Sequence, residues 1–166
     1  MRFRQIDRIV ELQLGYHIRA ERTLRADEEF LKDHFPHFPV MPGVLMLESL
    51  FQAGLWLVRV SDDFRWPLVL LHEVKSVKFA DFLTPGDILD IDADWIKTDG
   101  SRVTLKAQGR KRNSDRACVS ARLVIDRREL PRDPRPSTNE ELSNFVRAQF
   151  ESFFGPLSTI VTPVGN

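Results

Sequence analysis

The chain has 166 residues, of which 42% are hydrophobic and 29% charged, and its 24 Lys and Arg residues balance 24 Asp and Glu residues. This length and composition are typical of one globular domain. The balanced charge does not favour nucleic acid or an acidic membrane surface as a partner, so we expect neither. Cys118 is the only cysteine, so no disulfide can form within the chain, and we expect a reducing, cytoplasmic location.

The first part of the chain predicts two strands, Phe3–Leu12 and Tyr16–Leu24, with a turn near Gly15. The N-terminal residues lack the apolar region of a signal peptide, and we expect none. The polar segment that follows, residues 25–35, favours a short helix or a turn.

A long apolar segment, Val40–Val60, comes after a loop that contains two prolines, His34–Met41. Pro42 suits the first position of a helix because that position needs no N–H donor, and we expect a helix from Pro42 to about Val60. The segment is about as long as a membrane span, but Glu48 lies near its middle. We therefore expect a buried core helix and no membrane span.

The second half of the chain alternates apolar and polar residues with the period of a β-strand. Strands are predicted over residues 68–82, 88–96, 102–109 and 117–125, with turns at residues 84–87, 98–101 and 111–115. Such alternation is typical of an antiparallel sheet with one buried face. A helix that is apolar on nearly all sides must be enclosed. The sequence therefore predicts an α+β fold in which a curved antiparallel sheet wraps around a long central helix.

The last part of the chain predicts an extension outside this arrangement. It begins with a linker and continues as a helix from Asn139 to Phe154, ended by Gly155 and Pro156. Six apolar residues form a stripe along the helix: Leu142, Phe145, Val146, Phe150, Phe153 and Phe154. We expect this stripe to pack on the sheet, on a neighbouring subunit or on a partner protein. The expected division is a domain of residues 1–130 and a helical extension of residues 131–166.

Glu48 is an acid inside an otherwise apolar helical segment, and no Lys or Arg lies three or four residues from it. Gln52 lies one helical turn further on and can hydrogen-bond the carboxyl group. Burial without a cation favours the neutral acid, which is suited to donate a proton in catalysis. From these residues alone, a general acid and a buried structural pair are equally good interpretations.

His34 and His37 lie three residues apart in the loop before the helix. This spacing suggests a metal site, but the Phe-Pro pair between them prevents helical alignment of the two rings, and no third ligand is evident. We therefore expect no metal.

The stretch from His34 to Gln52 resembles the active-site signature of the 3-hydroxyacyl-ACP dehydratases, hotdog-fold enzymes of the FabZ and FabA type. The residues that match in register are His34, Phe35, Pro36, Pro39, Met41, Pro42, Gly43, Val44, Leu45, Glu48 and Gln52. His34, and not His37, stands at the family's spacing from Gly43 and Glu48. His37 occupies a position where the family usually has Gly, and it places a second imidazole near the site. A weaker resemblance extends over about residues 5–127, and the glutamate at position 48 is similar to the FabZ branch.

The resemblance implies a hotdog fold, assembled as a homodimer or a trimer of dimers, that acts on 3-hydroxyacyl chains carried by acyl carrier protein. It implies dehydration to trans-2-enoyl thioesters, in fatty-acid or related acyl-chain synthesis. His34 would be the base and Glu48 the acid, oriented by Gln52. The helix start at Gly43 and Val44 would hold the thioester oxygen. No cofactor is needed.

Two other functions stay open. A hotdog acyl-thioesterase would use a carboxylate to hydrolyse the thioester, and a non-catalytic acyl-binding or assembly protein would fit the unusual His37. The resemblance also implies an active site shared between subunits, with His34 of one working with Glu48 of the other. Because the carriers of this family are acidic, a cluster of cations is a candidate docking surface: Arg110, Lys111, Arg112 and Arg116.

Overall fold

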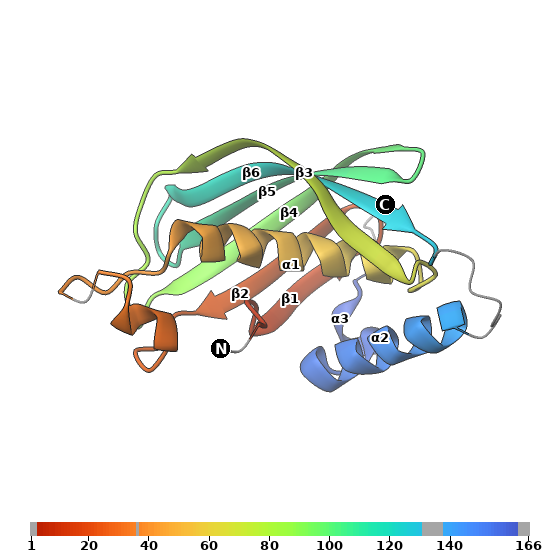
Figure 1. The fold of residues 1–166 in the computed structure, drawn as a ribbon, viewed down its shortest axis with the longest axis horizontal. Coiled ribbons are helices and arrows are strands. Elements are labelled where there is room, and N and C mark those ends of the chain that lie inside the picture. Colours follow the sequence, from red (N-terminus) through yellow and green to blue (C-terminus); the bar gives the residue numbers. More distant parts are fainter. Residues whose placement is uncertain (1–2, 36, 131–137, 163–166) are drawn as a thin grey trace.

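The computed structural model describes residues 3–35, 37–130 and 138–162 and has an α+β fold (Figure 1). Six antiparallel strands form one sheet in the order β1-β2-β4-β5-β6-β3. The strands are β1 Arg8–Gln13, β2 His17–Thr23, β3 Leu68–Phe79, β4 Ile88–Asp99, β5 Arg102–Lys111 and β6 Ala117–Arg128. The helices are the short 3-10 helix η1 Glu29–Lys32 and the α-helices α1 Gly43–Ser61, α2 Thr138–Phe154 and α3 Leu157–Ile160.

The central helix α1 lies lengthwise across the concave face of the sheet, as predicted (Figure 1). Its fully buried residues include Leu50, Ala53 and Leu57. Gly54 permits the closest approach to the sheet, because a Cβ at this position would lie 2.6 Å from Cδ1 of Leu105 on β5. By length and composition α1 is the one described helix that could cross a membrane. Here it is the enclosed core helix of the domain.

The alternation of the strands places their apolar residues against α1. Leu89, Ile91 and Ala93 of β4 are fully buried on this inner face. Asp92 lies between them on the outer face, yet it is only 6% exposed. It accepts hydrogen bonds there from Arg19 of β2 and Arg110 of β5. The inner face of the sheet is therefore closed by apolar packing and part of the outer face by ion pairs.

Several boundaries differ from the prediction, among them the starts of α1 and β1. Pro42 is not the first helical residue, because its ψ of 135° is extended, and its carbonyl accepts the N–H groups of Leu45 and Met46. The predicted first strand began at Phe3, whereas β1 begins at Arg8. Before β1, the N–H of Gln5 donates to the side chain of Gln52 of α1, and the N–H of Asp7 donates to the Glu21 carbonyl of β2.

The two edges of the sheet differ in their cover. Val161, just after α3, forms a parallel bridge with Leu12 of β1, and the N–H of Thr162 donates to the Leu12 carbonyl at 2.9 Å. On the opposite edge, β3 pairs with β6 alone among the described strands. Leu70 and Phe79 of β3 are exposed. A long, exposed and partly apolar edge strand is suited to pairing with another chain.

The predicted C-terminal helix is present, and part of its apolar stripe packs on a surface that was not among the three expected ones, the central helix α1. Phe150 of α2 is fully buried, with its ring centroid 5.4 Å from that of Trp56 and 5.9 Å from that of Phe64. The helix therefore packs on the C-terminal half of α1. Phe145, which the predicted stripe included, is 62% exposed. The predicted linker falls mainly on residues 131–137, which lie outside the described residues.

Candidate functional site

Gln52 holds Glu48 in a defined orientation on α1. The Gln52 side-chain oxygen accepts the N–H of Gln5 at 2.7 Å. Its Nε2 donates to the Phe3 carbonyl at 2.7 Å and to Glu48 Oε1 at 2.8 Å. Because the amide oxygen already serves Gln5, the NH₂ group is the part that faces the carboxyl group. The hydrogen bond predicted from the one-turn spacing is thus present.

The Glu48 side chain lies at a pocket of about 600 Å³. The residues that line it come from three segments: Phe3 and Arg4 before β1; Glu48, Phe51, Gln52, Leu55 and Trp56 of α1; and Gln149 and Phe153 of α2. This volume is within the range of small-molecule sites, and a mainly apolar lining with a few polar groups is typical of them. The amphipathic pattern of residues 139–154 did not predict this position of α2, because the contact depends on how distant segments pack.

The start of α1 offers two backbone donors. Neither the N–H of Gly43 nor that of Val44 donates a hydrogen bond to any described residue, as expected for the first turn of a helix. Val44 is 68% exposed. A Cβ on Gly43 would lie 3.0 Å from Cδ1 of Phe79 at the end of β3, so a larger residue would displace that ring. Free N–H groups at a positive helix end can stabilise a developing negative charge.

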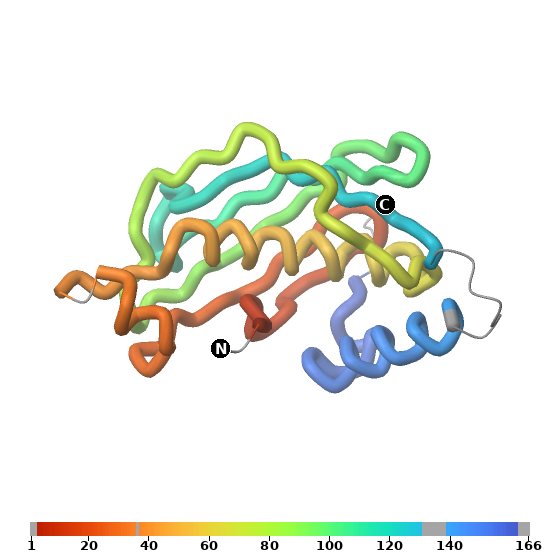
Figure 2. The backbone as a smooth tube through the Cα atoms, viewed as in Figure 1, coloured from red at the N-terminus to blue at the C-terminus, as the bar shows by residue number. Residues whose placement is uncertain are grey.

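The loop before α1, to which His34 belongs, lies at the opposite end of that helix from α2 (Figure 2). Its N–H donates to the Phe30 carbonyl at 3.0 Å, and its ring packs 4.6 Å from that of Phe35. Among the described residues, no hydrogen bond or ion pair joins His34 to Glu48. His34 is also absent from the residues that line the pocket of Glu48.

His37 does not strain the loop in which it replaces the family's Gly. The residue with a positive φ in this loop is Phe35, at 51°, whereas His37 is exposed and has no positive φ. In the part of the chain that the structure describes, no three His, Cys, Asp or Glu residues group closely enough to hold a metal ion.

Large apolar side chains are exposed around the helix start and the nearby end of β3. They are Phe35, Phe38, Val44, Phe79 and Phe82, each more than half exposed. Phe38 and Phe82 contact each other, with their ring centroids 5.9 Å apart. Together with the uncovered edge of β3, this group is typical of a surface that another molecule covers.

The family of the chain follows from comparison with known proteins. The FabA-like domain family matches residues 1–122, which is most of the chain. The protein belongs to the FabA-like family. The expectation drawn from the residues between His34 and Gln52 is thereby confirmed at the level of the family.

Several relatives of this FabA-like protein are named 3-hydroxyacyl-[acyl-carrier-protein] dehydratase FabZ. That of Levilactobacillus brevis is 38% identical over 101 residues, which cover 61% of this chain and 68% of the relative. That of Pediococcus pentosaceus is 39% identical over 55% of this chain and 62% of its own length. That of Bacillus subtilis is 33% identical over 60% of this chain and 70% of its own length. The chain thus matches about two thirds of each relative's length.

Solved structures share the hotdog fold with this FabA-like protein at low sequence identity. The dehydratase heterocomplex ApeI:P from Xenorhabdus doucetiae superposes with a TM-score of 0.61 at 17% identity, over 77% of this chain and 85% of the other. The smu.793 protein from Streptococcus mutans, bound to acetyl CoA, also has a TM-score of 0.61, at 15% identity over 78% of this chain and 93% of the other. Both likenesses concern the fold.

The cation cluster expected to dock a carrier is largely paired within this FabA-like protein. Arg110 donates to Asp92 at 2.7 Å, and Lys111 lies 3.2 Å from Asp87. Arg112 bridges two carboxylates at 2.5 Å each, those of Asp90 and Glu21. Three of the four cations of the expected docking surface thus face an acid of a neighbouring strand or turn, and the docking role itself stays a prediction.

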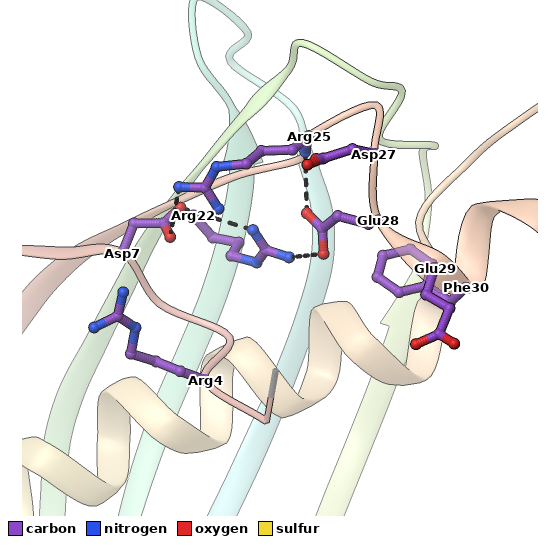
Figure 3. A pocket seen from close by; sticks show the side chains of 8 residues that line it. All are labelled: Arg4, Asp7, Arg22, Arg25, Asp27, Glu28, Glu29 and Phe30. Atoms are coloured by element: carbon purple, nitrogen blue, oxygen red, sulfur yellow. Dashed lines mark hydrogen bonds and ion pairs between the residues drawn. The ribbon is translucent and has the colours of Figure 1, made fainter. Parts of the chain in front are cut away.

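A second, charged pocket of about 550 Å³ lies between the N-terminal segment and η1 (Figure 3). Arg22 at its centre is nearly fully buried and pairs with Glu28 and with Asp7. Arg25 also pairs with Asp7, at 3.2 Å. The ion pairs of Arg22 join β2 to the segment before β1 and to the segment before η1. We interpret the cluster as structural, since its central cation is already satisfied by acids of the same chain.

Proposed function

We propose that the protein dehydrates 3-hydroxyacyl thioesters, carried on acyl carrier protein, to trans-2-enoyl thioesters. The observation that carries the proposal is Glu48, held by Gln52 at the mouth of an apolar pocket in a FabA-like chain. Relatives named for this reaction support it. A cytoplasmic location, with the carrier as a soluble partner, accords with the single cysteine, which is buried and unpaired.

The proposed reaction divides between three groups. His34 takes the proton from C2 of the acyl chain, and the electron pair of that bond forms the double bond between C2 and C3. The bond between C3 and oxygen breaks, and the departing hydroxyl takes a proton from neutral Glu48 and leaves as water. The N–H groups of Gly43 and Val44 stabilise the negative charge that builds on the thioester oxygen. Proton exchange with solvent then resets both side chains.

We further propose that the pair of His34 and Glu48 forms across a two-fold dimer. Two features support this: His34 is not among the residues that line the pocket of Glu48, and β3 pairs with β6 alone among the described strands. Gly43 and Glu48 are five residues apart and so differ by about 140° around α1. The Cβ direction of Gly43 therefore faces Phe79 of β3, whereas Glu48 faces the pocket, so each helix could serve two sites. The assembly would be a homodimer or a trimer of such dimers.

One assay separates the possible activities. The purified protein is incubated with a 3-hydroxyacyl thioester, and the absorbance of the enoyl thioester and the release of free thiol are both followed. A dehydratase raises the enoyl signal, a thioesterase releases thiol, and a binding protein does neither. Either of the last two results would contradict the proposal.

The role of Glu48 is tested with Glu48→Gln, which keeps the side-chain size but removes the acidic proton. We expect kcat for dehydration to fall by about 10²- to 10⁴-fold, the usual contribution of a general acid. Glu151→Gln on the exposed face of α2 is the matched control. Equal activity of the two variants would remove Glu48 from the mechanism.

A further inference from the structure

The face of α1 that carries Glu48 changes from polar to apolar along the helix. Glu48, Gln52 and Trp56 repeat every four residues, with Phe51 and Leu55 beside them, so all five lie on one face. The stretch from Glu48 to Trp56 is about 12 Å long. Its hydrogen-bonded acid lies at one end, and the aromatic ring of Trp56 lies at the other.

Helix α2 forms the opposite wall of this pocket. Gln149 and Phe153 are four residues apart and face the pocket together. The neighbouring face of α2 anchors it, since the rings of Phe150 and Phe154 lie 5.4 and 5.9 Å from that of Trp56. Phe153 is itself held in place, because the Arg4 guanidinium lies 5.0 Å above its ring.

The proposed reaction indicates what occupies the pocket. Glu48 protonates the hydroxyl on C3, so every carbon beyond C3 must extend away from this carboxyl group. The apolar surface next to Glu48 runs along α1 towards Trp56 and Phe153. A hydrocarbon chain buries its surface there, whereas water would gain few hydrogen bonds.

We propose that α2 forms the far wall of the acyl-chain site, and that Phe153 limits the length of acyl chain the enzyme accepts. This inference rests on the dehydratase function proposed above. It gives the C-terminal extension a role in substrate selection, through a helix that lies beyond the matched residues 1–122.

The test compares chain-length preference in three variants. Phe153→Ala enlarges the pocket, and Phe153→Trp fills it. Phe145→Ala removes the same side chain from the same helix at a residue that is exposed and does not line the pocket. The readout is the ratio of kcat/KM for 3-hydroxydodecanoyl thioester to that for 3-hydroxybutyryl thioester. Thermal unfolding of each variant checks that α2 is still packed.

We expect Phe153→Ala to raise this ratio by about tenfold, the scale on which a change in pocket size alters specificity. Phe153→Trp should lower it, and Phe145→Ala should leave it unchanged. A ratio that is the same in all four proteins would overturn the role of α2, even if the wild type is an active dehydratase.

Binding of unreactive acyl thioethers of the same two lengths, followed by calorimetry, separates this inference from the proposed function. If the wild type does not dehydrate, the function fails. If the ratio of the two Kd values still differs between the wild type and Phe153→Ala, α2 would be upheld as the wall of an acyl-binding site. Unchanged Kd values in every variant would overturn that role independently of activity.

Discussion

Gln52 connects three parts of the molecule through one amide group. Its oxygen and its two N–H bonds join α1 to the backbone of residues 3 and 5 and to Glu48. The residues before β1 are thereby held over the pocket, and the carboxyl group of Glu48 is aimed into it. A single side chain thus orders both the wall of the site and its acid.

Asp126, near the end of β6, is a residue at which stability should depend on pH. The hydrogen bond from Ser101, at 2.6 Å, lowers the pKa of Asp126. Burial of the carboxyl group raises this pKa, and the hydrogen bond from Arg128 lowers it further. A carboxyl group with a lowered folded pKa adds stability that is fully present above its unfolded pKa of about 3.9. This contribution is lost as the pH falls through the lower folded pKa.

We expect Asp126→Asn to reduce the free energy of unfolding by about 1–2 kcal/mol at pH 7, because a hydrogen-bonded charge is lost. The difference from wild type should shrink as the pH falls below about 4, where wild-type Asp126 also becomes neutral. Urea denaturation of both proteins, from pH 7 to below about 4, measures this difference in the free energy of unfolding. Asp115→Asn, in the exposed turn before β6, is the control. A difference that does not change with pH would contradict the role of the charge.

The packing of α1 against the sheet depends on Gly54. Alanine is normally favoured over glycine inside a helix by about 1 kcal/mol. At this position, however, a Cβ would lie 2.6 Å from Cδ1 of the fully buried Leu105, which has little room to move. We expect Gly54→Ala to destabilise the protein by about 1–3 kcal/mol, as overpacking does.

A double variant identifies the cause. In Gly54→Ala/Leu105→Ala the clashing methyl is gone, so the combined loss in the free energy of unfolding should be smaller than the sum of the two single losses. Chemical denaturation of the wild type, the two single variants and the double variant gives the combined loss and the two single losses. A Gly54→Ala variant more stable than wild type would show that the sheet yields at this point.

Helix α2 belongs to the apolar core although it follows the residues that match the family. Phe150 is fully buried, and Arg147 binds the Asp63 carboxylate at 2.5 Å while its guanidinium lies 4.7 Å above the ring of Phe64. These contacts hold α2 against the C-terminal end of α1. One hydrophobic core contains residues from both sides of position 130. The division expected near that position stays a prediction.

For the whole molecule, the central prediction is that the active site is shared between subunits. His34→Ala and Glu48→Ala homodimers should each be nearly inactive. After unfolding and refolding of an equal mixture, about half the dimers would contain one subunit of each kind. Each mixed dimer would have one site with both substitutions and one intact site. Dehydratase activity should then recover to about a quarter of the wild-type value.

Subunit exchange must be proven independently, for example by separating dimers of tagged and untagged chains. If exchange is complete and the mixture stays inactive, the two residues work within one chain and the shared site is wrong. The His34→Ala variant, unfolded and refolded alone by the same steps, measures the background dehydratase activity.

The sequence by itself determined the six strands, the two long helices and their order, but not the short helix α3. Alternation placed the four long strands, the apolar segment after Pro42 placed α1, and the spacing of Glu48 and Gln52 determined their hydrogen bond. These features were readable because they depend on local geometry, which has a period of two residues in a strand and 3.6 in a helix. The signature from His34 to Gln52 also led to the family.

Only the tertiary structure decided which distant segments meet. It placed α2 on α1, paired the cations of β5 and its turn with acids of β2 and β4, and brought Phe153 to the pocket beside Glu48. An amphipathic pattern shows that a face must be buried but carries no information about its partner, because many apolar surfaces would serve equally well. The partner is selected by the packing of the whole chain.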